Sequence, residues 1–243
     1  MLSWGILGAV VGALLGLTGA GGSVIALPLL QYLTGLSIHE ASVAVLPIVG
    51  IAAVVSLLPR IREARLSLAA LILLVSVPAT YLTAMVKVFV PPAAITALIV
   101  FFIVWALIQT WRTRHVSEGV PIPFWGVGAI VGVIAGVLTT LTGLGGGIVL
   151  TPLLAGLTDM DASEATATAI AVIAGNAFLS FFVQNSPSIP FGWLSFGGLV
   201  LGLIVANVLV MFLMRVCPKI CSQRLRTGVY TAVLMLAAVL MLV

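Results

Sequence analysis

The sequence predicts an all-α integral membrane protein built from two inverted repeats of about five helical segments each. Three observations support this: the chain is strongly apolar, a glycine-rich motif occurs twice at matched positions, and the basic residues gather in particular loops. The chain is 62% hydrophobic and 7% charged, with a mean hydropathy of +1.35, whereas soluble domains carry roughly 25% charged residues. This composition requires a lipid environment, and ten Lys and Arg residues are too few to indicate nucleic-acid binding.

The repeated motif reads LTGAGGSVIALPLL at residues 17–30 and LTGLGGGIVLTPLL at residues 141–154. A shift of 124 residues superimposes the two copies and also matches Glu40 with Glu164. Glycine clusters that interrupt apolar segments at corresponding places in two halves are typical of transporters with a substrate site near the bilayer midplane. The expected organisation is a first repeat at 1–115, a cytoplasmic linker at 116–123 and a second repeat at 124–243.

Long uncharged runs mark the predicted spans, because about 20 apolar residues cross the hydrocarbon core of a bilayer. Three runs in each half have this length: 41–59, 66–86, 92–111, 165–183, 191–214 and 227–243. Each half also opens with a stretch, 3–34 or 124–158, that the glycine motif divides into pieces of about 15 and 13 residues. At 1.5 Å per residue these pieces are roughly 20 Å long, shorter than the hydrocarbon core of about 30 Å.

The basic residues set the topology, because Lys and Arg collect in cytoplasmic loops. Three arginines within 60–65 place the loop after the first span inside, and basic residues near 112–115 and 215–226 do the same for the linker and the late loop. Lys87 is the exception and is expected in a loop on the outside. The loop at 184–190, equivalent to 60–65, has no charge and lies outside. The repeats are therefore inverted, and both termini are expected outside.

The two glycine-interrupted stretches must each begin and end on one side of the membrane. A re-entrant hairpin fits this constraint and the short pieces, while two short full spans per stretch fit the charges as well. In the hairpin arrangement, the broken or re-entrant helices meet near the bilayer midplane from opposite faces. Non-helical backbone at that depth is tolerated only where it is buried in protein or lines a cavity, so we expect the two tips to face each other.

The tips are the candidate substrate site. A helix that begins at a tip presents unpaired backbone N–H groups and the positive end of its dipole, which together favour an anion. Glycine lets a ligand approach the backbone and permits positive φ, and Thr and Ser hydroxyls add donors. The expected substrate-binding residues are Thr18, Gly19, Gly21, Gly22 and Ser23 in the first tip, and Thr142, Gly143, Gly145, Gly146 and Gly147 in the second.

The acidic residues have a structural interpretation. Glu40 and Glu164 follow Ser37 and Asp161 by three residues, which is the spacing of a capping box at a helix start. We prefer this interpretation to proton coupling. Proton relays and cation pumps place ionisable groups inside spans, and the predicted spans hold none in their middle. An anion leaving a cell gains about 2.3 kcal/mol per charge per 100 mV, so its export needs no coupling residue.

The predicted membrane segments also contain amide side chains and further glycines. Asn176 and Asn207 fall inside predicted spans, where an unpaired amide is costly, so they either bond neighbouring helices or line the pathway. Gln184 lies near a span end and is expected to reach the headgroups. Four further glycines occupy matched positions and are expected to allow close helix packing: Gly8, Gly12, Gly132 and Gly136.

Neither a catalytic residue nor a metal or cofactor site is predicted. Cys217 and Cys221 are spaced by four residues, but no second pair of ligands lies nearby in the sequence. His39 and His115 are both expected at surfaces, and the chain has no G-x-S-x-G motif. An intramembrane enzyme is therefore not expected.

The two motifs, their positions at the start of each half and the chain length resemble the sulfite exporter TauE/SafE family of membrane permeases. The resemblance covers essentially the whole chain. It implies a multi-pass exporter of a small sulfur-containing anion, sulfite or an organosulfonate, in the cytoplasmic (inner) membrane, with the tip residues shaping the site. Ser23 in place of the glycine found at position 147 makes the two tips chemically unequal.

Three functional alternatives remain beside an exporter that works by alternating access between inverted repeats. The first is a channel-like anion pore with the same tips. The second is a permease for another small anion, such as a carboxylate or another oxyanion. The third is a structural subunit that transports nothing when reconstituted alone. In each case the expected partners are the lipid bilayer and, for the first two, a small anion.

Overall fold

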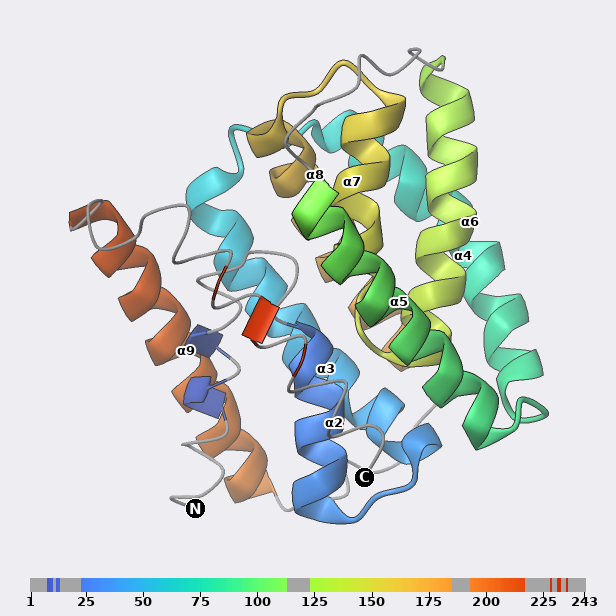
Figure 1. Cartoon of the computed structure of the whole chain (residues 1–243), viewed down its shortest axis with the longest axis vertical. Coiled ribbons are helices and arrows are strands. Elements are labelled where there is room, and N and C mark those ends of the chain that lie inside the picture. Colours follow the sequence, from blue (N-terminus) through green and yellow to red (C-terminus); the bar gives the residue numbers. More distant parts are fainter. Residues whose placement is uncertain are drawn as a thin grey trace.

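The structure is a computed structural model that describes residues 8–10, 12–13, 23–112, 123–184, 193–216, 228, 231–232 and 235. All regular elements among these residues are helical (Figure 1). The first half contributes α2 (Ser23–Thr34), α3 (Ile38–Leu57), the short 3-10 turn η2 (Leu58–Arg60), α4 (Leu66–Lys87) and α5 (Pro92–Arg112). The second half contributes α6 (Phe124–Thr142), α7 (Gly147–Leu157), α8 (Ala162–Val183) and α9 (Trp193–Val216). The predicted all-α class is confirmed.

Within these residues, four helices are long and apolar enough to cross a membrane: Ile38–Arg60, Leu66–Lys87, Phe124–Thr142 and Ala162–Val183. Two shorter apolar stretches, Pro92–Trp105 and Gly197–Val210, lie in α5 and α9. The spans predicted at 41–59, 66–86 and 165–183 agree with α3, α4 and α8 to within three residues. Apolar length therefore identified these helices correctly.

Some predicted elements fall outside the described residues. They are the glycines and threonine of the first tip at 18–22, nearly all of the linker at 116–123 and most of the last span at 227–243. Ser23, the last member of the first tip, is the first residue of α2.

The starts of α3 and α8 are fixed by side-chain caps. The Ser37 hydroxyl accepts from the Glu40 N–H, and the Glu40 carboxylate accepts from the Ser37 N–H, so the predicted capping box of α3 is confirmed. At α8, the Asp161 carboxylate accepts from the Glu164 N–H at 2.7 Å. The Glu164 carboxylate pairs with Arg65 instead of closing the second box. An ion pair with a neighbouring helix thus replaces half of that cap.

The centre of the molecule is formed by α3 and α8, which pack against each other and are buried on most sides. The outer helices turn large apolar side chains outward. Examples that are more than half exposed on α4, α5 and α9 are Leu74, Leu82, Phe101, Leu201 and Phe212. An exposed apolar surface of this extent suits contact with lipid rather than water.

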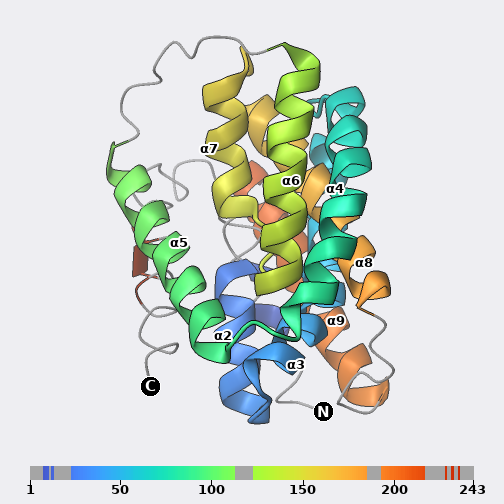
Figure 2. The same ribbon diagram turned by 90° about the vertical axis from the view of Figure 1, so that its right-hand side faces the viewer.

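Glycines bring α6 against α4, and this is the most extensive helix pair in the structure (Figure 2). A Cβ added to Gly132 would lie 2.8 Å from the Ile72 carbonyl oxygen, and one added to Gly136 would lie 2.8 Å from that of Ser76. Real side chains do not tolerate such contacts, so only glycine lets the two backbones come this close. The expected packing role is confirmed.

The same type of contact joins Gly8 and Gly12 to α9. An added Cβ would lie 1.9 Å and 2.2 Å from the carbonyl oxygens of Leu199 and Leu203, respectively. Leu199 and Leu203 lie 127 positions after Ile72 and Ser76, the residues of α4 whose carbonyls contact the glycines of α6. The opening glycines of each half therefore pack on a helix of the other half.

α6 and α7 form a hairpin with unequal arms. They contain 19 and 11 residues, roughly 29 Å and 17 Å of helix, so the expected division into pieces of about 15 and 13 residues is wrong for the second stretch. Figure 2 shows α6 and α7 side by side, with their free ends at the top and the turn that joins them near the middle of the molecule. The turn lies at the residues predicted for the second tip. Since α6 is long enough to cross a membrane by length alone, the depth of the turn in the molecule had to come from the structure.

Candidate substrate site

The second glycine tip is a buried turn between α6 and α7. Gly143 caps α6 in the left-handed conformation at a φ of 69°. Gly145 and Gly146 also have positive φ, of 69° and 68°, and α7 begins at Gly147. A side chain strongly disfavours this conformation, so the turn depends on glycine at three of its four positions.

The tip is pressed between α3 and α8. A Cβ added to Gly143 would lie 2.2 Å from the Ser42 carbonyl oxygen of α3, and one added to Gly145 would lie 2.6 Å from Ile173 Cγ2 of α8. Gly146 is less crowded, since the nearest atom to an added Cβ lies 3.6 Å away. The first two glycines therefore serve packing as well as backbone conformation.

The start of α7 carries unused backbone donors. The N–H groups of Val149 and Leu150 donate to the Gly146 carbonyl at 3.0 Å and 2.9 Å. Within the described part of the chain, the N–H groups of Gly145, Gly146 and Gly147 have no acceptor. Three free donors at the positive end of a helix dipole form the arrangement that favours an anion.

A cavity of about 20 Å³ adjoins two of these three residues. It is lined by residues of the hairpin, among them Thr142, Gly146 and Gly147, and by Phe102 of α5. Such a volume holds about one water molecule and is too small for a sulfur oxyanion. In this conformation the tip is therefore closed.

Thr142, an expected ligand residue, uses its hydroxyl within the hairpin. Its Oγ1 donates to the Leu138 carbonyl at 2.7 Å and accepts from the Leu144 N–H at 3.2 Å. The hydroxyl proton is committed to α6, so Thr142 supports the turn and offers an anion no donor in this state.

A buried layer of polar side chains lies between α4, α6 and α8, close to the tip. We call it the polar layer, and its six members are fully buried: Ser76, Thr80, Thr139, Thr140, Asn176 and Ser180. Ser76 Oγ donates to Asn176 Oδ1, and Thr140 Oγ1 lies 3.1 Å from Ser180 Oγ. Among the described residues, three buried side-chain atoms have no hydrogen-bond partner, and all belong to this layer: Thr80 Oγ1, Thr139 Oγ1 and Asn176 Nδ2.

Sequence reasoning identified only Asn176 in this layer. Hydroxyl side chains inside membrane helices commonly bond to a carbonyl of their own helix, as Thr140 does to Gly136, so each is inconspicuous alone. A usable signal was the four-residue spacing of Ser76 with Thr80 and of Asn176 with Ser180, which puts each pair on one helix face.

Asn207 is different, because its amide is fully used between helices. Its Nδ2 donates to Ser56 Oγ at 3.0 Å and to the Ala52 carbonyl at 3.4 Å, joining α9 to α3. Of the two roles expected for this residue, the contacts match helix bonding.

Lys87 is the last residue of α4, so the expectation that it lies in a loop is wrong. α4 continues to Lys87, which is 4% exposed, and its Nζ donates to Ser42 Oγ at 2.7 Å and to Gln184 Oε1 at 2.6 Å. Gln184 therefore binds Lys87 rather than the headgroups. A lysine at the C-terminal end of a helix is also favoured by the helix dipole.

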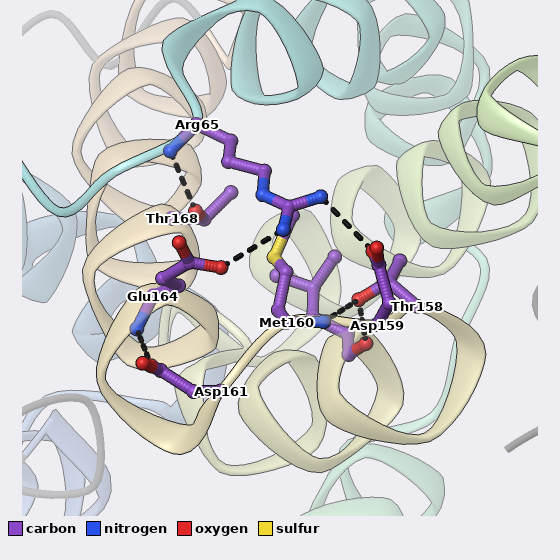
Figure 3. A network of polar contacts seen from close by, with 8 residues as sticks. Arg65, Thr158, Asp159, Met160, Asp161, Glu164 and Thr168 are labelled. Atoms are coloured by element: carbon purple, nitrogen blue, oxygen red, sulfur yellow. Dashed lines mark hydrogen bonds and ion pairs between the residues drawn. The ribbon is translucent and has the colours of Figure 1, made fainter. Parts of the chain in front are cut away.

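The other end of α4 is held by Arg65 (Figure 3). Its guanidinium donates to Asp159 and Glu164 at 3.0 Å each, and its backbone N–H donates to Thr168 Oγ1 at 3.0 Å. The partly exposed pairs contribute about 0–1 kcal/mol each. Together these contacts join the start of α4 to the loop between α7 and α8 and to the first part of α8.

The described helices suit an integral membrane protein, and a glycine-interrupted hairpin inside such a protein is typical of transporters. The chain matches the sulfite exporter TauE/SafE family over residues 4–241 of 243 and belongs to this family. Comparisons with curated proteins and with solved structures give no match. Because the family consists of membrane transporters, the chain is grouped with transporters rather than enzymes.

Proposed function

We propose that the protein exports a small sulfur-containing anion, of the sulfite or organosulfonate type, across the cytoplasmic membrane. The substrate class follows from the family. The binding site is inferred from the second tip, where the N–H groups of Gly145, Gly146 and Gly147 have no acceptor in the described structure. A cavity adjoins Gly146 and Gly147. Such a site holds an anion without a basic side chain.

The first tip contributes the other half of this site. Its sequence, Thr18 to Ser23, repeats the second motif with a serine in place of the last glycine. α2 follows it as α7 follows the second tip, so a second helix N-terminus is directed at the same anion. The Ser23 hydroxyl gives the two sides different hydrogen-bonding capacity.

The tips are re-entrant and the two repeats are inverted. In support of this, the loop that contains Arg65 bonds to the loop between α7 and α8, and the sequence predicts both loops to be cytoplasmic. In Figure 2, α2 and α7 extend from the middle of the molecule toward opposite ends. The equivalent glycine contacts on α4 and α9 fit the same symmetry.

Transport proceeds by alternating access, in which the closed tip opens to one side at a time. The cavity at the tip is too small for the substrate in this state, so a continuous pore would need a different resting structure. The polar layer, with unpaired atoms on Thr80, Thr139 and Asn176, lies on the route. Water or the anion would supply their missing partners once the layer opens.

The direct test is uptake of radiolabelled sulfite into proteoliposomes. We expect saturable uptake that unlabelled sulfite and a sulfonate inhibit and acetate does not. Saturation and counterflow distinguish a transporter from a channel. Liposomes without protein are the control. Absence of uptake by folded, inserted protein, or equal competition by acetate, would contradict the proposed function.

Topology is tested with single cysteines in a chain whose Cys217 and Cys221 are replaced by serine. Phe89, 84% exposed between α4 and α5, is expected on the outside, and Arg62 is expected inside. We expect a membrane-impermeant maleimide to label Phe89→Cys in intact cells, and to label Arg62→Cys only after the membrane is opened. The reverse pattern would rule out the proposed orientation.

A further inference from the structure

A second pocket, of about 380 Å³, opens at the end of the molecule opposite the Arg65 contacts. It lies where α3 begins and where α4 and α8 end. Its polar lining consists of His39, Tyr81, Lys87 and Gln184, and the remaining lining residues are apolar. The pocket is therefore large enough for a small oxyanion, and its wall contains the lysine Lys87.

Lys87 has a buried amine whose described partners carry no negative charge. Its Nζ donates to the Ser42 hydroxyl and the Gln184 amide oxygen, both neutral, so one of its three donors remains. No carboxylate among the described residues lies within ion-pair distance of it. The nearby Glu40 carboxylate is engaged by the hydroxyl and N–H of Ser37. Buried charges in proteins are normally paired, because an unpaired one is costly.

The other polar groups of the pocket do not neutralise Lys87. Gln184 presents its oxygen to the lysine, and its Nε2 is held by the Ser180 carbonyl at 3.2 Å. The His39 ring and the Tyr81 hydroxyl can each donate a hydrogen bond. The chemical complement of this lining is an anion.

The pocket is separated from the second tip by one residue. Ser42 is fully buried, its hydroxyl accepts from Lys87, and its carbonyl oxygen is the atom against which Gly143 packs. An anion at Lys87 would therefore lie one residue layer away from the tip.

We propose that this pocket is a second anion site, in which Lys87 holds a small oxyanion between the glycine tip and the outside of the cell. The direction and the sulfur oxyanion rest on the proposed function, whereas the binding of an anion at Lys87 does not. The site gives a departing anion a cationic position after it leaves the tip. It also explains why a lysine is buried with neutral partners.

The test is equilibrium binding of radiolabelled sulfite to the purified full-length protein in detergent, at constant ionic strength. We expect Lys87→Gln to weaken sulfite binding by about tenfold or more. Lys87→Arg is expected to retain most of the sulfite affinity. Arg62→Gln, which removes an exposed charge at the opposite end, is the matched control and leaves binding unchanged. Unchanged affinity in folded Lys87→Gln, or no sulfite binding by the folded wild type, would overturn the site.

A second pair of variants keeps the lysine in place. Ala84 lines the pocket, so Ala84→Glu would supply a carboxylate that competes with the anion, and Ala84→Gln has the same size without the charge. We expect sulfite to bind the glutamate variant much more weakly than the glutamine variant, because only the glutamate adds a carboxylate to the pocket. Equal binding by both variants would overturn the site even if Lys87→Gln fails to fold.

Transport measurements distinguish this site from the proposed function. If the wild type binds sulfite through Lys87 but does not transport it, the export proposal fails and the anion site stands. If the wild type transports sulfite and neither binding nor KM depends on Lys87, the anion site fails and the export proposal stands.

Discussion

Replacing Gly143 by alanine is expected to abolish sulfite transport, whereas the same change at Gly156 in the same hairpin leaves it near the wild-type rate. At Gly143, φ is +69°, which costs a residue with a Cβ about 1–2 kcal/mol. The new Cβ would also meet the Ser42 carbonyl oxygen at 2.2 Å. That atom is backbone, so α3 itself would have to move and the tip would lose its position.

Gly156 is the matched control because it lies in the regular part of α7 and an added Cβ has no atom within 4 Å. Alanine there is expected to be neutral or to stabilise the helix by up to about 1 kcal/mol. Uptake into proteoliposomes measures transport, and melting in detergent confirms that each variant folds. Wild-type transport by Gly143→Ala, or equal losses at both positions, would show that the geometry of the tip does not matter.

Replacing Asn176 by leucine is expected to lower transport at least about tenfold with little loss of stability, while Asn207→Leu gives the opposite pattern. Asn176 Nδ2 has no partner in the described structure, so leucine removes an unsatisfied buried group together with one hydrogen bond. Asn207 uses its amide on Ser56 and Ala52. Losing these bonds leaves buried groups unpaired, at a cost of about 1–3 kcal/mol.

The two asparagine variants control for each other, since each exchanges a buried amide for the same apolar side chain. Unfolding in denaturant and sulfite uptake are measured on both. If Asn207→Leu is the variant that loses transport while Asn176→Leu is merely less stable, the route does not pass through the polar layer.

Apolar length was sufficient to locate α3, α4 and α8, because the thickness of the bilayer sets how many residues a span needs. The capping box of α3 was equally readable, since it depends on two residues three positions apart. Matched glycines also predicted close packing, although not which helix they would meet. These features depend on local chemistry or on a fixed external length.

The features that the sequence did not predict depend on tertiary packing. The rule that assigned Lys87 to an outer loop counts charges and is insensitive to burial, so it missed the contacts with Ser42 and Gln184. The unequal arms of the hairpin depend on where α3 and α8 leave room for the turn. The polar layer combines hydroxyls from three helices, and no spacing within one helix reveals that they meet.

The packing of α4 has a consequence for how the protein is made. Its main neighbours, α6 and α8, both come later in the chain. The glycines that pack against the carbonyls of Ile72 and Ser76 belong to α6. While the first half is being inserted, α4 can meet only lipid or temporary neighbours on that face. The native packing of α4 therefore forms late in synthesis. Two halves made as separate polypeptides would have to associate before either became stable.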